Sequence, residues 1–353
     1  MSLKEQSLIK IIIFIEMLLP LAFYFSNSSF VLYATIPFTI LNAFLIFNKI
    51  KVNLTYFLVF SFIFLGLVFS LILNKWDFSI QLFSGLVLLL WNFTISILVV
   101  KYEARKIVLC IFCFFVFFIF LKGVVGDFHP DFGNHIFAES SRNYVSAILI
   151  VYYIAYAALS FIENKKVSIF ATVFLLLSCI ILFGRTGIAV SGVLLLYAIY
   201  NNYGAKISIL FTIFLTGLSS IIYYYAMEYT NFADGLDTPR TLMIREYISS
   251  ISESEIIFGR NFFQCCETIV AFGPNPHNSF IQLHSLYGLY GISLSILVFL
   301  IVLISKNISL TFLLFLIYFR YFFDVLGLFY FLDFSIIIIF LYCLDSILKR
   351  GKL

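Results

Sequence analysis

Long apolar runs alternate with short polar breaks along almost the whole chain, and each run holds about 20 residues, enough to cross roughly 30 Å of hydrocarbon. Backbone polar groups inside a bilayer have to be satisfied within each segment, so these runs predict helices. The predicted spans are residues 7–25, 29–47, 53–73, 79–100, 107–125, 143–162, 167–183, 187–203, 207–227, 278–304, 308–325 and 328–347. The pattern therefore predicts an all-α, polytopic integral membrane protein with about 12 transmembrane helices, folded as a single membrane domain over residues 1–353.

Two of the breaks are much longer than the others. The smaller loop covers residues 126–142, and the larger loop covers residues 228–276, directly before the span that begins at residue 278. The larger loop contains turn residues, an amphipathic segment at 240–251 and several phenylalanines, which argue against a disordered linker. Loops of this length in a compact protein commonly carry function.

The composition excludes a soluble globular protein. Of 353 residues, 63% are hydrophobic and 11% are charged, whereas soluble domains carry about a quarter charged residues. No basic run indicates nucleic acid as a partner. The first apolar span is not followed by a cleavage-site pattern and continues into further spans, so we expect it to remain as an anchor.

Positive charges are divided unequally between the two sides of the predicted helices. Counting the breaks alternately places 14 of the 22 lysines and arginines on the side that holds both chain ends, and 8 on the other side. The positive-inside rule then puts both termini in the cytoplasm and the two long loops outside it. Twelve of the 14 inner charges are lysines, but six of the 8 outer charges are arginines, so phosphate binding is the first explanation for the outer guanidinium groups.

Charged residues inside the predicted spans are few, and each is expected to be paired or functional because burial in the membrane is costly. Arg320 and Asp324 are four residues apart, so we expect them to neutralise each other on one helix face. The sequence offers no partner for Glu16 or Asp333.

The cysteines and loop histidines predict no metal centre. Zinc spacing is absent among the six cysteines, and a strained disulfide between the adjacent Cys265 and Cys266 is not expected. His129 and His135 lie close to acidic residues, but the spacing matches no metal-binding motif and is typical of a solvated loop.

The tenth predicted span begins with PHNSFIQLHSLYGLYG, which places His277 and Asn278 at the outer mouth of a helix. A histidine there can serve as a base near neutral pH, and a helix start favours nearby anions. The structural alternative is that Asn278 or Ser279 simply caps the helix while His277 leads into it. His284, by itself, is more typical of a hydrogen-bonded interior histidine.

Three outer arginines are candidates for binding a diphosphate at the depth of the lipid head groups. Arg185 lies in the short break FGRTG, Arg142 directly precedes a span, and Arg245 lies in the amphipathic part of the larger loop. Guanidinium groups bind phosphate through paired, charge-assisted hydrogen bonds, and three converging groups would hold a diphosphate. The alternatives are snorkelling to lipid phosphate or salt bridges with Glu246 and Glu253.

These motifs resemble the signature of the superfamily of Wzy-type O-antigen polymerases and O-antigen ligases. The shared features are His277-Asn278, nine further residues, Gly288, two residues and Gly291, after a large outer loop, together with GRTG around Arg185 and the stretch from Arg245 to Gly259. ESSRNYVS, around Arg142, is more similar to the polymerase branch.

The resemblance implies a membrane glycosyltransferase of the bacterial inner membrane that works at the periplasmic face in O-antigen and lipopolysaccharide biosynthesis. It would transfer a glycan from undecaprenyl diphosphate to the sugar of an incoming lipid-linked repeat unit, without cofactor or metal. His277 would take the acceptor proton, Arg142, Arg185 and Arg245 would bind the diphosphate, and Asn278, Gly288 and Gly291 would support the site. The partners would be the lipid-linked donor and acceptor, membrane lipid and a chain-length regulator protein. Not every arginine of the family pattern can be placed in this sequence, so Arg240 and Arg260 are assigned no contact.

Three alternatives remain at this point. An O-antigen ligase that passes the glycan to lipid A core shares the same motif. A flippase for lipid-linked sugars also commonly has twelve spans, although transporters place charges at the midplane between repeated halves, and no repeat is evident here. A scaffolding subunit is the third alternative, but a scaffolding role would not explain why arginines are grouped on the outer side.

Overall fold

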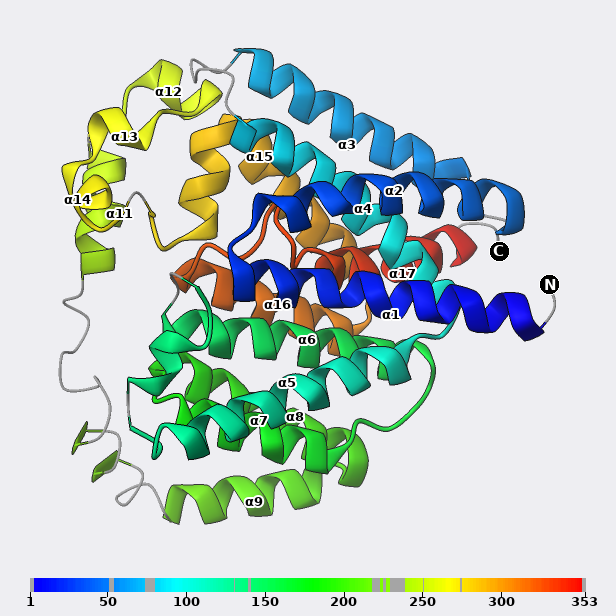
Figure 1. The fold of residues 1–353 in the computed structure, drawn as a ribbon, viewed down its shortest axis with the longest axis vertical. Coiled ribbons are helices and arrows are strands. Elements are labelled where there is room, and N and C mark those ends of the chain that lie inside the picture. Colours follow the sequence, from blue (N-terminus) through cyan, green and yellow to red (C-terminus); the bar gives the residue numbers. More distant parts are fainter. Residues whose placement is uncertain are drawn as a thin grey trace. The chain divides into compact units, whose positions relative to one another are not determined.

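The structure is a computed structural model, and it describes residues 3–50, 54–73, 80–129, 131–138, 141–217, 223–224, 227–228, 239–249, 251–273 and 275–350. The described part is helical throughout (Figure 1). The N-terminal half contains α1 (Leu3–Ser26), α2 (Ser29–Lys49), α3 (Leu54–Leu73), α4 (Ile80–Lys101), α5 (Arg105–Val125), η1 (Phe132–His135) and α6 (Arg142–Ile162). The remaining helices are α7 (Ile169–Ile181), α8 (Arg185–Tyr203), α9 (Ala205–Gly217), α11 (Pro239–Ser249), α12 (Glu253–Phe258), α13 (Phe262–Cys265), α14 (Glu267–Ala271), α15 (Ser279–Ile304), α16 (Ile308–Phe323) and α17 (Phe334–Arg350).

Each of the twelve apolar ranges predicted from the sequence contains a helix, most with ends within a few residues of the prediction. Seven of these helices, α1 to α6 and α15, contain a stretch long and apolar enough to cross a membrane. The chain is therefore a multi-pass helical membrane protein. Shorter apolar helices occur in α7, α9 and α16.

Contacts divide the chain into two compact units. Unit 1 comprises Met1–Pro20, Ser28–Tyr102 and Pro239–Leu353, and unit 2 comprises Leu21–Asn27 and Glu103–Thr238. The single membrane domain expected from the sequence stays a prediction.

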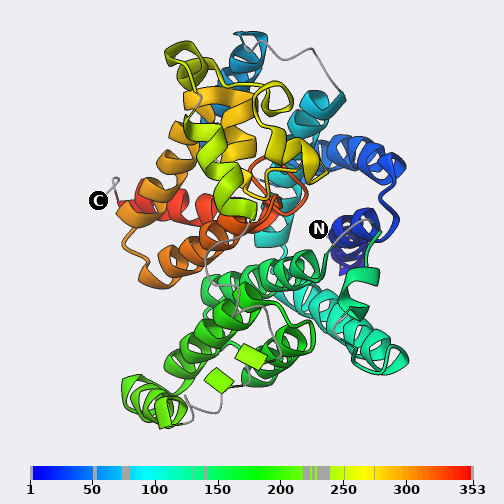
Figure 2. The same cartoon turned by 90° about the vertical axis from the view of Figure 1, so that its left-hand side faces the viewer.

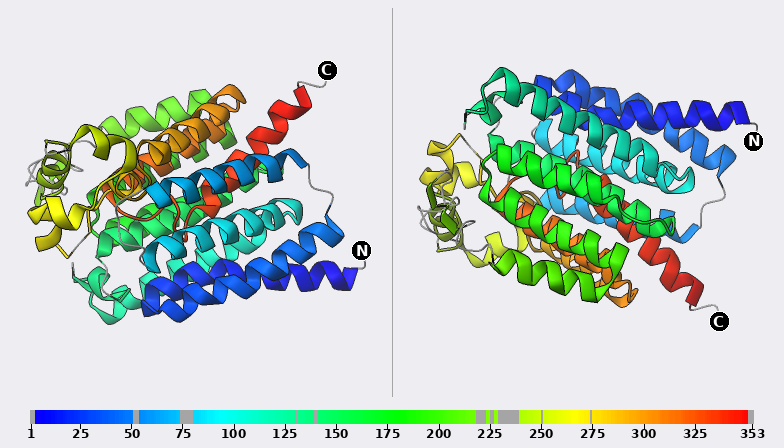
Figure 3. Two further views of the ribbon diagram at one scale, coloured as in Figure 1. Left: turned by 90° about the horizontal axis from the view of Figure 1, so that it is seen from above. Right: turned by 90° about the horizontal axis from the view of Figure 1, so that it is seen from below.

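Unit 1 is built around α4 and α15. The first of these packs on α2 and α17, and the second packs on α3, α16 and α17. The start of α1 and the end of α17 lie at one end of unit 1, whereas the short helices α11 to α14 of the larger loop lie at the opposite end (Figures 1 and 3). Within this unit, the chain ends and the larger loop therefore occupy opposite ends of the bundle.

Unit 2 is centred on α6, in which every residue from Val145 to Ser160 is buried. The helices α5, α7 and α8 pack around it. The smaller loop contains η1 and ends where Asn134 Oδ1 accepts a hydrogen bond from the Arg142 backbone N–H at 3.0 Å, which fixes the first residue of α6. The loop boundary predicted at residues 126–142 coincides with the interval between α5 and α6.

The described part of the larger loop folds into four short helices around a small hydrophobic core. This core contains Met243, Tyr247, Phe262, Cys266 and Ile269, and it packs on Ile281 of α15. Figure 2 shows the short helices of the loop beside α15. Among the described phenylalanines of the loop, Phe262 is buried in this core, whereas Phe258, Phe263 and Phe272 are exposed. The turn residues at 231–238 lie outside the described residues.

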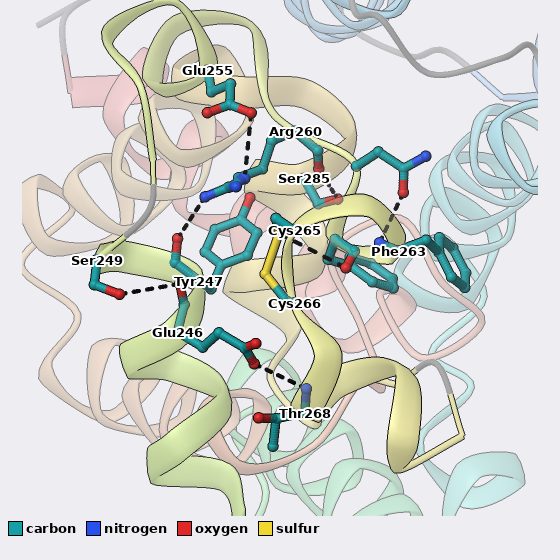
Figure 4. Close-up of a disulfide and its surroundings, with 12 residues drawn as sticks. Glu246, Tyr247, Ser249, Glu255, Arg260, Phe263, Cys265, Cys266, Thr268 and Ser285 are labelled. Atoms are coloured by element: carbon teal, nitrogen blue, oxygen red, sulfur yellow. Dashed lines mark hydrogen bonds and ion pairs between the residues drawn. A yellow bond between two sulfur atoms is a disulfide. The ribbon is translucent and has the colours of Figure 1, made fainter.

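Cys265 and Cys266 form a disulfide, so the expectation that these neighbours stay unpaired was wrong (Figure 4). The two residues lie at the junction between α13 and α14, and Cys266 is outside both helices in a non-helical conformation, with φ −133° and ψ 86°. Because α13 ends there, the backbone of Cys266 is not held in helical geometry, and the two sulfur atoms can be joined. A disulfide suits an oxidising compartment, which agrees with an extracytoplasmic larger loop.

Candidate active site

His277 lies just before α15, on the side of unit 1 that carries the larger loop. Its backbone has φ +47°, in the left-handed region, and its N–H donates to Asn275 Oδ1 at 2.8 Å. Asn278 caps the helix, because its Oδ1 accepts hydrogen bonds from the Phe280 and Ile281 backbone N–H groups at 2.8 and 3.1 Å. The capping role proposed as the alternative thus belongs to Asn278, and His277 is left with its ring available for another role.

The imidazole of His277 is half-buried, and its Nδ1 is enclosed without a hydrogen-bond partner in the described part of the chain. Burial lowers the pKa of His277, the positive charge of Arg240 lowers it further, and the negative charge of Asp324 acts in the opposite direction. The net effect keeps the imidazole neutral at physiological pH. A neutral imidazole is the form that accepts a proton.

Asp324 is the centre of the charged cluster beside His277. Its carboxylate is fully buried and lies between two arginines: Arg320 Nη1 is 2.6 Å from Oδ2, and Arg240 Nη2 donates to Oδ1 at 3.3 Å. The first contact is a close ion pair that lacks hydrogen-bond alignment, so its attraction is mainly coulombic. The pairing of Arg320 with Asp324 expected from the sequence is confirmed, but the shared helix face is not, because Asp324 follows the end of α16 in an extended conformation.

Ser279 attaches this cluster to the first turn of α15. Its hydroxyl donates to the Asp324 carbonyl oxygen at 2.7 Å and accepts from the Leu326 N–H at 3.1 Å. The two arginines and the one carboxylate give the cluster a net positive charge. The cluster lies at the N-terminus of α15, where the helix dipole adds to that positive charge. The cluster therefore suits an anionic substrate group held beside a neutral base.

Arg240 was missed by the sequence reasoning, and no local signal could have found it. Its partner Asp324 is 84 residues away, and only the packing of α11 against the start of α15 brings them together.

Arg245, the residue predicted from the sequence, is exposed on α11. Five positions along a helix turn a side chain by about 140°, so Arg245 and Arg240 point to different faces. The diphosphate-binding role of Arg245 stays a prediction.

Gly288 and Gly291 lie in the first half of α15, C-terminal to His277, at positions where the backbone or its neighbours require glycine. Gly288 has φ +56°, which interrupts the helical conformation, and a Cβ there would overlap the Ile257 carbonyl oxygen at the end of α12. Only glycine allows both the left-handed backbone and this close approach. A Cβ on Gly291 would come 2.9 Å from Tyr287 Cβ and 3.0 Å from Leu283 Cγ, so this position also favours glycine.

The end of α12 is attached to α15 by polar contacts as well. Tyr247 Oη and His284 Nδ1 are 2.8 Å apart, and His284 Nε2 is 3.0 Å from the Ile256 carbonyl oxygen. Ser285 Oγ donates to the Arg260 carbonyl oxygen at 2.7 Å. Both ring nitrogens of His284 are thus engaged, which supports its interpretation as an interior, hydrogen-bonded histidine.

Arg260 has a structural role in the larger loop. Its side chain is 7% exposed, and its Nη1 donates to the Tyr247 carbonyl oxygen at 3.0 Å (Figure 4). Its Nε lies 3.5 Å from Glu255 Oε1, and its guanidinium lies over the Tyr247 ring. These contacts join α11 to the segment after α12.

Arg142 and Arg185 are the first residues of α6 and α8 in unit 2, and both are half-buried. The two helix starts are neighbours, because a Cβ on Gly184 would lie 3.3 Å from Asn143 Oδ1, and one on Gly187 would lie 2.9 Å from Ser146 Oγ. Two adjacent helix N-termini that each begin with arginine provide dipoles and guanidinium groups for an anion. Their convergence with His277 and Arg245 stays a prediction.

The remaining loop histidines are solvated as expected. The side chains of His129 and Asp131 are exposed neighbours, with 3.6 Å between Nδ1 and Oδ2. In the described part of the chain, no group of three or more histidine, cysteine, aspartate or glutamate side chains is arranged to hold a metal ion.

No protein-family model, curated protein or solved structure matches this chain. The resemblance to the O-antigen polymerase and ligase superfamily therefore remains an inference from the residues that carry it.

Arg240→Gln should move the acidic limb of the activity profile to higher pH. The charge of Arg240 lowers the pKa of His277, so its removal raises that pKa, and the base is then lost at a less acidic pH. The measurement is the pH dependence of the rate of the glycan transfer that the family resemblance implies. Arg245→Gln removes the same charge from the same helix and should leave the limb in place, whatever it does to the rate. A limb that does not move in Arg240→Gln would contradict the electrostatic link.

Proposed function

We propose that this protein is a membrane glycan polymerase that extends a polysaccharide from lipid-linked repeat units. The donor is a glycan on undecaprenyl diphosphate, and the acceptor is a hydroxyl group on the sugar of an incoming lipid-linked unit. The observation that carries the proposal is His277, half-buried and with its pKa lowered by burial and by Arg240, beside the Arg240–Asp324–Arg320 cluster at the N-terminus of α15. A base next to a net positive charge is what this transfer needs.

In the proposed reaction, His277 accepts the proton of the acceptor hydroxyl while its oxygen forms a bond to the anomeric carbon of the donor. The bond between that carbon and the diphosphate oxygen breaks, and the electron pair leaves with undecaprenyl diphosphate. Diphosphate is already a competent leaving group, so catalysis consists of positioning, charge stabilisation and one base. No cofactor enters this scheme.

The arginines take two roles in this proposal. Arg240 lies beside His277 and would attract the anionic head group toward the base. Arg142 and Arg185, with their helix N-termini, would bind the diphosphate of a lipid-linked substrate, and Arg245 would extend the positive surface on α11. Asn278, Gly288 and Gly291 would set the position of the first turns of α15.

The proposed topology has twelve spans, with both termini in the cytoplasm and the reaction at the periplasmic face of the bacterial inner membrane. The excess of lysine on one side supports it, as does the placement of the α1 and α17 ends opposite α11 to α14 in unit 1 (Figure 3). The disulfide in the larger loop also supports a periplasmic location.

The test is a reconstitution of the purified protein in liposomes with a lipid-linked repeat unit as the only glycan. A polymerase would convert the single unit into a ladder of lipid-linked products. Transfer that occurs only after lipid A core is added would identify a ligase instead. Movement of the lipid-linked unit across the bilayer without any glycan transfer would identify a flippase.

Arg185→Ala should reduce extension in this assay by about 10- to 100-fold, because a hydrogen bond to a charged group contributes roughly 1.5–3 kcal/mol. The measurement is the initial rate of ladder formation at saturating and limiting substrate. Arg185→Lys keeps the charge but loses the paired geometry, so it should recover only part of the rate. A wild-type rate in Arg185→Ala would remove this residue from the site.

A further inference from the structure

Glu16 lies in the middle of α1, far along the sequence from every residue of the proposed site, and its side chain is fully buried. Its neighbours come from two other helices of unit 1. Asn42 Nδ2 of α2 donates to Glu16 Oε2 at 2.8 Å, and Trp91 Nε1 of α4 donates to the same oxygen at 2.9 Å. Within the described residues, no lysine, arginine or histidine contacts this carboxyl group.

Two acceptor atoms in this cluster have no donor. Glu16 Oε1 and Asn42 Oδ1 are both buried and make no hydrogen bond in the described part of the chain. An ionised carboxylate has only acceptors, and so does an amide carbonyl, so neither group can satisfy the other. An ionised Glu16 would combine a buried charge without a counter-ion with two unsatisfied acceptors, and each of these is costly.

The orientation of the Asn42 amide is fixed by Thr94. The Thr94 hydroxyl donates its single hydrogen to the Trp91 carbonyl oxygen at 3.0 Å, so Oγ1 presents a lone pair toward Asn42. Asn42 Nδ2 lies 3.5 Å from that Oγ1 and 2.8 Å from Glu16 Oε2. The amide nitrogen therefore faces both acceptors, and the amide oxygen is the atom left without a donor.

We propose that Glu16 binds a proton and is held as a neutral acid paired with Asn42. A proton on Oε1 turns the unsatisfied carboxyl oxygen into a donor, and the unsatisfied Asn42 Oδ1 is the acceptor it needs. An acid and a primary amide side by side form a ring of two hydrogen bonds, N–H···O on one side and O–H···O on the other. The N–H···O half is already in place. One proton thus removes the charge and satisfies both orphan oxygens.

This site does not depend on the proposed transfer reaction. It joins α1, α2 and α4 through a neutral polar network, and such networks stabilise a buried core when every member is satisfied. The same two oxygens would otherwise suit a small monovalent cation such as Na⁺, which satisfies acceptors while the carboxylate stays charged. A bound proton predicts that Glu16→Gln keeps the wild-type stability, whereas a bound Na⁺ predicts that Glu16→Gln loses it.

The test compares thermal midpoints of the full-length protein in detergent. Glutamine can donate to Asn42 Oδ1 and accept from Asn42 Nδ2, so Glu16→Gln should melt like the wild type, and Glu16→Ala should melt several degrees lower. Glu5→Gln, an exposed change on the same helix, controls for loss of a carboxylate. A Glu16→Gln protein that is as unstable as Glu16→Ala, or a wild-type midpoint that rises when Na⁺ replaces choline, would overturn the proposal.

A spectroscopic measurement decides the question even if a variant does not fold. Infrared spectra of wild-type protein labelled with isotope-substituted glutamate should show a protonated carboxyl C=O band at neutral pH that shifts on labelling. In folded Glu16→Gln that band should be lost. The absence of any protonated glutamate band in the wild type would show that Glu16 is ionised, and the proposal would fail.

Discussion

Replacing His277 with asparagine should lower the rate of glycan transfer by about 10²- to 10⁴-fold, the range that general base catalysis supplies. Asparagine cannot accept the acceptor proton, but it tolerates the left-handed backbone that residue 277 adopts at φ +47°. The His277 Nδ1 makes no hydrogen bond in the described part of the chain, so the fold should lose little. The variant should reach the membrane in normal amounts and leave single repeat units unextended.

The measurement is the initial rate of ladder formation in liposomes, with the amount of inserted protein determined in parallel. His129→Ala serves as a matched control, because His129 is an exposed loop histidine whose ring lies beside Asp131. The control should retain the wild-type rate. Ladders of wild-type length and rate from His277→Asn would remove His277 from the chemistry, even if the rest of the cluster proved important.

The helices of this protein could be predicted from the sequence because apolar runs of membrane length leave the backbone few alternatives. The range 278–304 was expected as a span and corresponds to α15 at Ser279–Ile304, with Asn278 as its cap. The larger loop was expected to be ordered, and two of its aromatic residues, Tyr247 and Phe262, lie in a core in its described part. Local patterns of this kind are visible in one sequence since they depend on neighbours in the chain.

The site could be predicted only in part, because its charges pair over long distances. Arg320 and Asp324 were expected to pair because four residues place them on one helix face, but the contact between Arg240 and Asp324 requires α11 to fold back onto α15. Glu16 likewise pairs with residues of other helices, namely Asn42 of α2 and Trp91 of α4. Asp333 was left without a partner by the sequence, and its carboxylate accepts the backbone N–H groups of residues 328–330, which carry no side-chain signal.

The adjacent cysteines were mispredicted although they are neighbours in the chain. The expectation that Cys265 and Cys266 stay unpaired was based on the strain of a disulfide between adjacent residues. The chain leaves helical geometry at Cys266, between α13 and α14. Cys266 is buried in the loop core with Met243 and Tyr247, and Cys265 is half-buried beside it. The break between two short helices was the missing information, and it is set by the packing of the loop core.

Arg320→Met should destabilise the protein by about 3 kcal/mol, at the lower end of the 3–5 kcal/mol that follows the loss of one partner from a buried ion pair. Asp324 would be left fully buried with only Arg240, whose side chain is 26% exposed and 3.3 Å from Oδ1. That residual contact is the reason for the lower value. The measurement is the thermal midpoint and the monodisperse yield in detergent.

The double variant Arg320→Met with Asp324→Asn separates an ion-pair effect from a packing effect. Removing both charges avoids an uncompensated buried carboxylate, so the double variant should be more stable than Arg320→Met alone. A packing effect would instead make the two changes additive. An Arg320→Met protein with wild-type midpoint and yield would show that the 2.6 Å contact contributes nothing to the fold. The cluster beside His277 would then owe its position to Ser279 and the turn at residues 324–327, and not to the pairing of charges.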